Sequence, residues 1–124
     1  MTLQKRPKKQ RYSARLFFQF KVTLRGKPNK LRLCEERVVL FRATSAEEAY
    51  DIAVAKGRAS EHSYENQAGG TVSFEFIGIL DLIDLAMFSE DGEVWSNQRT
   101  MLMPKERSSK FLPTRKNLTS LWKR

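Results

Sequence analysis

The sequence predicts an α+β domain, an antiparallel sheet of the order β-β-α-β-β with one long helix packed on one face. Two segments, residues 12–24 and 71–82, alternate between apolar and polar side chains, which is typical of strands with one buried face. Between them, Ser45 begins a helix-capping pattern that leads into small and apolar residues at helical spacing. Turn-forming Gly, Pro and Asn residues separate these elements.

The chain of 124 residues divides into one domain and two basic ends. A second hydrophobic core would need roughly 50 more residues. Residues 1–11 are predicted to form a flexible basic arm, residues 12–103 the single α+β domain, and residues 104–124 a basic tail. The tail carries apolar residues at helical spacing, namely Leu118, Leu121 and Trp122. This spacing suggests a short helix that docks on a partner.

The first two strands are predicted to form a long hairpin. In residues 12–24 the even-numbered side chains are apolar, and only Phe17 interrupts the polar face. Residues 25–30 contain Gly, Pro and Asn, which favour a turn. The second strand, residues 31–42, ends in a Val-Val-Leu-Phe run that suggests burial on both faces.

The helix is predicted over residues 46–61. Ser45 and Glu48 form a capping box, and the acidic first turn complements the positive end of the helix dipole. Small residues recur at steps of three and four, at Ala46, Ala49, Ala53 and Gly57. Such a stripe lets a helix axis lie close to a sheet.

Two strands are predicted after the helix. Residues 71–82 alternate clearly, and Gly78 within them indicates a bulge or a close crossing. Residues 93–103 form a weaker fourth strand that Pro104 ends.

The formal net charge of +9 is distributed unevenly along the chain. Residues 1–43 contain thirteen Lys and Arg against two Asp and Glu, and residues 104–124 contain seven against one. Residues 44–103 contain three against eleven. The basic ends therefore suit a polyanion, the acidic part of another copy, or simple solvation.

Nucleic-acid binding would use these ends, since basic and aromatic side chains together contact phosphates and stack on bases. The candidate contact residues are Lys5, Arg6, Lys8, Lys9, Arg11, Lys110, Arg115, Lys116 and Trp122. No helix-turn-helix, zinc-finger or RNA-recognition signature accompanies them, so binding through these arms would be weakly specific and sensitive to salt.

The chain shows no motif for a metal, a cofactor or a membrane. Cys34 is the only cysteine, which excludes an intrachain disulfide and a zinc cage built of cysteines. We expect it to be a buried core residue whose pKa Glu35 and Glu36 raise. No apolar run approaches ~18 residues, and no signal peptide is evident, so we expect a cytoplasmic protein.

No catalytic residues are predicted. His62, the only histidine, lies near the expected helix end, where it would complement the helix dipole. A general base would need a partner, for which Glu61 or Tyr64 is close in sequence. The carboxylates of the third strand are explained as a solvated face with Arg15 and Arg37 as cross-strand partners.

Several segments in order resemble a family of small uncharacterised bacterial proteins, a domain of unknown function. They are residues 12–16 (Tyr-Ser-Ala-Arg-Leu), 36–43 (Glu-Arg-Val-Val-Leu-Phe-Arg-Ala), 45–49 (Ser-Ala-Glu-Glu-Ala), 61–66 and 76–81. The resemblance covers roughly residues 12–95. It implies a bacterial or phage origin and a compact α+β fold, and it implies no activity.

The resemblance draws attention to the polar residues at the helix-to-loop junction. If the sheet brings two arginines near them, they would form a small polar binding pocket. The candidate residues are Arg15, Arg42, Glu61, His62, Tyr64 and Asn66.

These observations favour a non-enzymatic binding or interaction module that self-associates or takes a protein partner. Sheet edges and the exposed face that carries Phe17 would supply the surfaces. The alternative is a nucleic-acid-binding accessory protein that acts through its basic ends.

Overall fold

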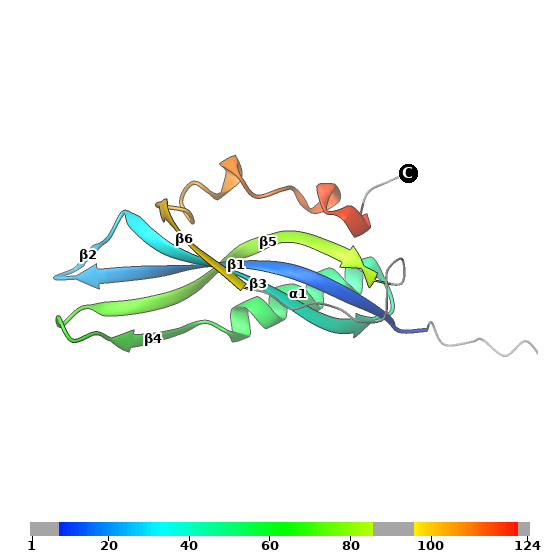
Figure 1. Ribbon diagram of the computed structural model, residues 1–124, viewed down its shortest axis with the longest axis horizontal. Helices are drawn as coiled ribbons and strands as arrows, with labels where there is room; N and C mark the ends of the chain where they lie inside the picture. The colour runs from blue at the N-terminus through cyan, green and yellow to red at the C-terminus, as the bar shows by residue number, and fades with distance from the viewer. Residues whose placement is uncertain (1–7, 86–95, 122–124) are drawn as a thin grey trace, which may run out of the picture.

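The computed structural model describes residues 8–85 and 96–121. Its elements are β1 (Gln10–Leu24), β2 (Lys27–Pro28), β3 (Leu31–Ala43), α1 (Ala46–Ala59), β4 (His62–Glu65), β5 (Thr71–Asp84), β6 (Ser96–Leu102) and three short 3-10 turns, η2 (Ser108–Lys110), η3 (Arg115–Asn117) and η4 (Thr119–Leu121). The strands form one sheet in the order β4-β5-β1-β3-β6, with β2 paired to the end of β1 (Figure 1). Every pairing is antiparallel. The predicted α+β class is therefore confirmed.

β1 is the central strand because its predicted alternation continues over its whole length. It pairs with β3 from Gln10↔Ala43 to Phe20↔Leu33, which confirms the long hairpin. Arg25 and Gly26 have positive φ angles of 53° and 77°, and this tight turn leads from β1 into β2. Of the predicted arm, residues 1–7 lie outside the described residues, and β1 begins two residues earlier than predicted.

The helix begins where the sequence predicts but ends earlier. Ser45 Oγ accepts a hydrogen bond from the Glu48 amide at 3.1 Å. The Glu48 carboxylate does not return to the Ser45 amide, as in a capping box, but accepts from Thr44 Oγ1 at 2.7 Å. The hydrogen bonds that the Thr44 hydroxyl and amide donate to this carboxylate lower the pKa of Glu48. The helix ends at Ala59, two residues before the predicted end, with Ser60 as its C-cap.

The described part of the chain contains two strands that the sequence did not predict, the two-residue β2 within the predicted turn and β4. Residues 62–65, predicted as a helix end and loop, form β4 and pair with the start of β5. All four residues are exposed, so no apolar alternation signals a strand. The following loop closes on Asn66 Oδ1, which accepts hydrogen bonds from the amides of Ala68 and Gly70.

The main core lies between α1 and the face of the sheet that carries the even-numbered residues of β1. It contains Tyr12, Ala14, Leu16, Phe18, Ala43, Ala49, Ala53, Phe74, Ile79, Leu82 and Leu118. The predicted small-residue stripe of α1 supplies the close approach. A Cβ at Gly57 would lie 2.4 Å from ring atoms of Phe76. The stripe therefore seats the helix directly on β5.

The tail covers part of the opposite face of the sheet (Figure 1). The Phe111 ring packs edge-on against Phe17, which is fully buried. The prediction that Phe17 lies on an exposed face and supplies an interaction surface is therefore wrong. A Cβ at Gly78 would lie 2.8 Å from Leu112, so the predicted close crossing is present. β5 shifts register against β1 on both sides of this point, as expected for bulges.

In place of the predicted short helix, the described part of the tail forms 3-10 turns. Leu118 is 2% exposed and reaches the main core. Trp122 lies outside the described residues. Here the tail docks on its own chain, and docking on another molecule stays a prediction.

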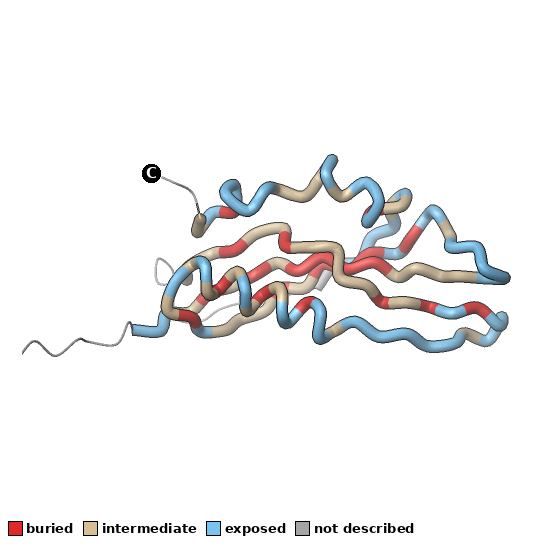
Figure 2. Tube along the Cα trace, turned by 180° about the vertical axis from the view of Figure 1, so that it is seen from behind, coloured by how far each residue is buried: buried red, intermediate tan, exposed pale blue. Residues whose placement is uncertain are grey.

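The helix covers only one end of its face of the sheet (Figure 2). Its 14 residues span about 21 Å, whereas the 15 residues of β1 span about 50 Å. Beyond the helix end, five large apolar side chains are exposed: Leu24 (46%), Leu31 (62%), Leu33 (40%), Tyr64 (49%) and Leu102 (49%). Their register places them all on the helix-bearing face. We call these five residues the bare apolar face.

Candidate functional site

The sheet does not bring the predicted polar cluster into one pocket. Arg42 lies opposite Arg11 at the start of β1. His62 lies opposite Phe74, which in turn lies opposite Phe20 near the other end of β1, and we call such a set of opposed residues a row. Nine residues of strand separate the two rows, which is about 30 Å. Arg15 and Arg42 also point to the face opposite α1, while His62 and Tyr64 share the helix-bearing face.

Glu61, His62, Tyr64 and Asn66 do remain neighbours, along β4. The His62 ring stacks on Tyr64 with centroids 6.1 Å apart, and both residues are exposed. The Glu61 carboxylate accepts a hydrogen bond from the Phe76 amide at 3.0 Å. The structure therefore places these residues on an edge surface, and a binding role for them stays a prediction.

Of the two predicted cross-strand partners of the third-strand carboxylates, Arg15 does lie opposite Asp81 in the register of β1 and β5. The prediction for Arg37 is wrong, because β3 is not a neighbour of β5. Arg15 pairs with Glu36 on β3 at 3.1 Å, and Arg37 pairs with Glu35 on its own strand. The register explains the difference, because the Arg37 side chain lies on the helix-bearing face and β3 supplies acids on both faces.

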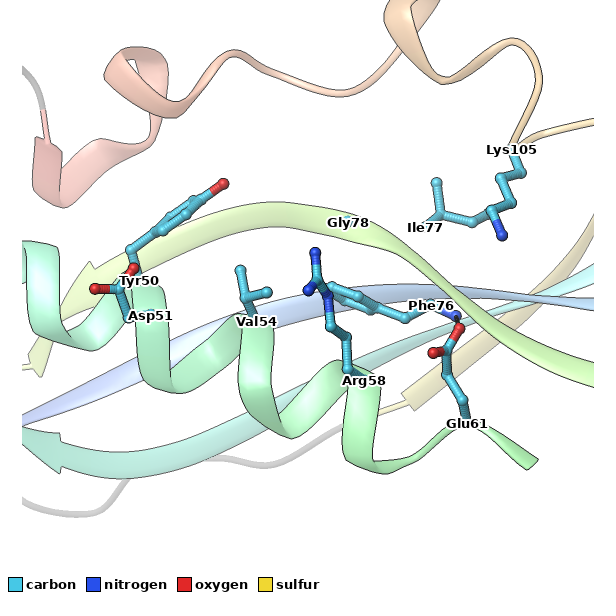
Figure 3. Close-up of a pocket in the computed structure, with 9 residues that line it drawn as sticks. All are labelled: Tyr50, Asp51, Val54, Arg58, Glu61, Phe76, Ile77, Gly78 and Lys105. Carbon is cyan, nitrogen blue, oxygen red and sulfur yellow. Dashed lines mark hydrogen bonds between the residues drawn. The ribbon is translucent and has the colours of Figure 1, made fainter.

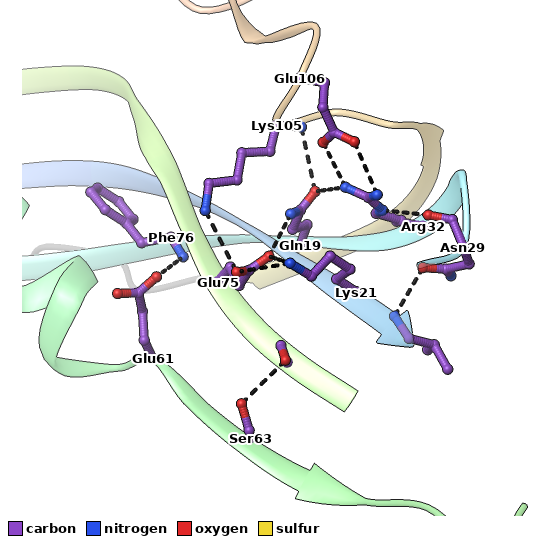
Figure 4. A network of polar contacts seen from close by, with 12 residues as sticks. Gln19, Lys21, Asn29, Arg32, Glu61, Ser63, Glu75, Phe76, Lys105 and Glu106 are labelled. Atoms are coloured by element: carbon purple, nitrogen blue, oxygen red, sulfur yellow. Dashed lines mark hydrogen bonds and ion pairs between the residues drawn. The ribbon is translucent and has the colours of Figure 1, made fainter. Parts of the chain in front are cut away.

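The start of the tail is held by a buried polar network that the sequence did not reveal (Figure 4). Arg32 is 2% exposed and donates two hydrogen bonds to the Glu106 carboxylate, at 2.7 and 3.0 Å. It also donates to Gln19 Oε1 at 3.1 Å and to the Asn29 carbonyl at 2.7 Å. The hydrogen bonds from Arg32 lower the pKa of Glu106. An arginine in an alternating strand predicts a solvated position, so no sequence signal marks this network.

Glu75 extends the same network along β5. It accepts from Gln19 Nε2 at 2.8 Å and lies within 3.5 Å of the Lys21 and Lys105 ammonium groups. Desolvation raises the pKa of Glu75, but the Gln19 hydrogen bond and the two ammonium groups outweigh it, so the pKa is lowered. The network thus anchors the first residues of the tail, Lys105 and Glu106, to β5 and β3 respectively.

A cleft of about 560 Å³ lies between α1, the outer edge of β5 and the tail (Figure 3). Tyr50, Val54 and Arg58 form one wall at steps of four residues along α1. The remaining lining residues are Asp51, Glu61, Phe76, Ile77, Gly78 and Lys105. We call this the helix–edge cleft. The helical spacing could have indicated the first wall, but nothing in the sequence placed Lys105 there.

Cys34 is a buried core residue, as predicted. Burial raises its pKa to about 11, while Arg99 and Arg32 act in the opposite direction. The predicted cause, Glu35 and Glu36, is wrong, because desolvation is the dominant effect.

Residues 8–85 and 96–121 contain no group of three or more His, Cys, Asp or Glu side chains placed to hold a metal ion. Over the same ranges, no helix has the length and apolar character needed to cross a membrane.

The predicted polyanion contacts lie partly within the described residues. Lys8, Lys9, Lys110, Arg115 and Lys116 are exposed, and Arg11 is partly buried in β1. The Arg115 guanidinium lies 4.3 Å from the centre of the Tyr50 ring. The remaining three candidates, Lys5, Arg6 and Trp122, lie outside the described residues.

The elements described above define a small α+β domain in which one helix covers half of one face of an antiparallel sheet. The chain belongs to the family described as a domain of unknown function, DUF4288, whose model matches residues 11–96. The match spans β1 to β5 and stops at the first residue of β6, so the tail lies outside it. No curated protein and no solved structure shows a significant match to the chain.

Proposed function

We propose that this chain is a non-enzymatic interaction module that self-associates through the β6 edge of its sheet. The observation that carries the proposal is that β6 is a regular edge strand beside exposed leucines. We further place the protein in the cytosol, where a single cysteine such as Cys34 stays reduced.

β6 offers a continuous edge for strand pairing. Its register against β3 runs without a shift from Leu31↔Leu102 to Arg37↔Ser96. In the described part of the chain, no strand pairs with its outer side. Natural edges are blunted by short strand length, bulges, prolines or charged side chains, and β6 is a seven-residue strand without a bulge or a proline. The one charged side chain of β6, Arg99, is engaged by Glu36 at 3.2 Å.

The opposite side of the sheet has the protection that β6 lacks. β4 is only four residues long. Beyond β4, β5 carries two register shifts against β1. The Phe76 amide of β5 already donates a hydrogen bond to the Glu61 carboxylate. This contrast favours β6 over the β4–β5 side as the edge for a long, regular pairing with a second copy.

A second copy of the chain is the partner that fits this edge best. Two β6 strands can pair antiparallel about a two-fold axis, which makes the interface self-complementary. Leu31, Leu33 and Leu102 lie beside the edge and would lose exposed apolar surface in such a dimer. Contiguous apolar patches of several hundred Å² are typical of interaction sites.

Light scattering coupled to size exclusion tests this proposal. We expect the wild type to be a dimer at micromolar concentrations, and the pair Leu33→Lys with Leu102→Lys to be monomeric. Leu24→Lys is the matched control, since Leu24 is similarly exposed at 46% but lies at the β1–β2 turn. Thermal unfolding checks that each variant folds. A monomeric wild type, or equal effects of the pair and the control, would contradict the proposal.

Binding of nucleic acid is the second candidate, favoured by how the tail lies on the sheet. Phe111 and Leu118 face the protein, while Lys110 and Lys116 are exposed. A bound tail of this kind presents its cations to solvent, as a polyanion contact requires.

A salt titration of binding to generic DNA and RNA tests this candidate. We expect the affinity to fall steeply with salt, with a slope reduced by about 2 in Lys110→Gln with Lys116→Gln. Absence of binding at low salt, or an unchanged slope in the double variant, would overturn it.

A further inference from the structure

The helix–edge cleft is a second surface, separate from the β6 edge, and its floor is an unpaired strand. β4 pairs with β5 only over Thr71 to Phe74. From Glu75 onward, no strand in the described residues pairs with the outer side of β5. The backbone groups of this stretch need hydrogen-bond partners, which only solvent, side chains or a ligand can supply there.

The contact of Glu61 shows that an outward-facing amide of β5 can donate a hydrogen bond to a group that is not part of a strand. The Glu61 carboxylate takes the hydrogen bond of the Phe76 amide at 3.0 Å, in the place that a carbonyl of a neighbouring strand would have. The next residues, Ile77 and Gly78, line the cleft. An extended peptide laid along them would continue the pairing that β4 begins.

The walls limit the length of such a ligand. α1 contributes Tyr50 and Val54 on one side, and the tail contributes Lys105. The register shifts of β5 also prevent a long regular ladder. A volume of about 560 Å³ suits a peptide of a few residues and lies in the usual range of ligand sites.

The charges of the cleft select the chemistry of the ligand. Arg58 from α1 and Lys105 from the tail approach the same stretch of β5 from opposite walls (Figure 3). Two charges of the cleft already have partners: the Glu61 carboxylate accepts from the Phe76 amide, and the Lys105 ammonium lies 3.5 Å from the Glu75 carboxylate. Asp51 lies beside Tyr50, toward the other end of the cleft. The middle of the cleft thus favours an anionic group that a guanidinium can bind.

We propose that the helix–edge cleft binds a short extended peptide along the outer edge of β5, with an acidic side chain between Arg58 and Lys105. Main-chain hydrogen bonds to an exposed strand edge supply affinity in this mode, and the flanking side chains supply specificity. The proposal uses none of the residues on the β6 edge, so either surface can fail its test alone.

Two matched pools of tetrapeptides, acetylated and amidated at their ends, test the proposal by amide NMR. One pool carries Glu at its third position and the other carries Gln. We expect saturable shifts of the Ile77 and Gly78 amides with the Glu pool, and at least fivefold weaker binding of the Gln pool. No saturable shift at these amides, or equal binding of the two pools, would overturn the proposal.

Arg58→Gln should weaken binding of the Glu pool about fivefold to tenfold, the usual range for loss of one charge-assisted contact. Lys56→Gln is the control, because Lys56 is an exposed base on the same helix that does not line the cleft. Glutarate is titrated separately. If it produces the same shifts with the same affinity as the Glu pool, the cleft is a site for small anions and the peptide proposal is wrong.

Discussion

Arg32 shows how a single buried cation ties two distant parts of the chain together. It lies on β3, yet its guanidinium is held by Glu106 of the tail and by Gln19 of β1. A buried guanidinium is stable only when its donors are satisfied. The tail is therefore part of the fold of this chain, although the family match stops before it.

Glu106→Gln should destabilise the protein by about 1–2 kcal/mol, because the buried Arg32 loses its counter-charge. This loss of stability is smaller than for a fully buried ion pair, because the Glu106 side chain is 44% exposed and water partly screens its charge. Urea unfolding measures it, with Glu65→Gln at an exposed position as control. A change no larger than that of the control would contradict the role of this contact.

Cys34 predicts a dependence of stability on alkaline pH. Burial raises its pKa from 9.0 to about 11, so the folded state holds the thiol proton more tightly than the unfolded state. Its contribution is complete below pH 9 and is lost as the pH rises toward 11. Cys34→Ala should remove this part of the decline in unfolding free energy. Equal slopes for wild type and variant over this pH range would refute the assignment.

Single residues differ in how well sequence predicts them. Gly78 was predicted to mark a bulge or crossing because a glycine inside an alternating strand is costly unless something approaches it. Arg32 could not be predicted, because its partner Glu106 is distant in sequence and a basic residue in a strand normally faces water.

At the scale of elements, the contact of α1 with β5 depends on Gly57. Alanine is favoured over glycine in a helix by about 1 kcal/mol. Here, however, a Cβ would lie 2.4 Å from the Phe76 ring. We expect Gly57→Ala to destabilise the protein by about 1–2 kcal/mol, as overpacking does.

A double-mutant cycle with Phe76→Leu separates the overlap from helix propensity. Removing the ring should make Gly57→Ala much less costly than it is in the wild type. A stabilising effect of Gly57→Ala in the wild-type background would show that the helix does not rest on Phe76.

Long elements were predicted well, and short ones were not. β1 and β5 alternate over many residues, and β3 contains an apolar run, so their signals are strong. β4 has four exposed residues and exists only because β5 offers it an edge. The helix end was predicted too late because Ser60 and Glu61 are not helix breakers, and the capping at Ser60 is formed by backbone bonds.

At the scale of the whole molecule, the fold class followed from sequence, but the surfaces did not. The exposure of the leucines on the bare apolar face could not be predicted, because a strand pattern does not show how far a single helix reaches. The helix–edge cleft depends on three elements meeting, one of them the tail. Likewise, the prediction of a polar pocket was wrong. Which side chains meet depends on the sheet face and the strand register, and the order of residues in the chain does not show these.

The central claim is that two copies pair through β6, and hydrogen exchange at two protein concentrations tests it most directly. Raising the concentration across the dimerisation range should slow exchange of the amides of Gln98 to Leu102 that face outward, and leave the amides of β4 unchanged. Exchange from β6 that is independent of concentration, in a protein that light scattering shows to dimerise, would contradict the account.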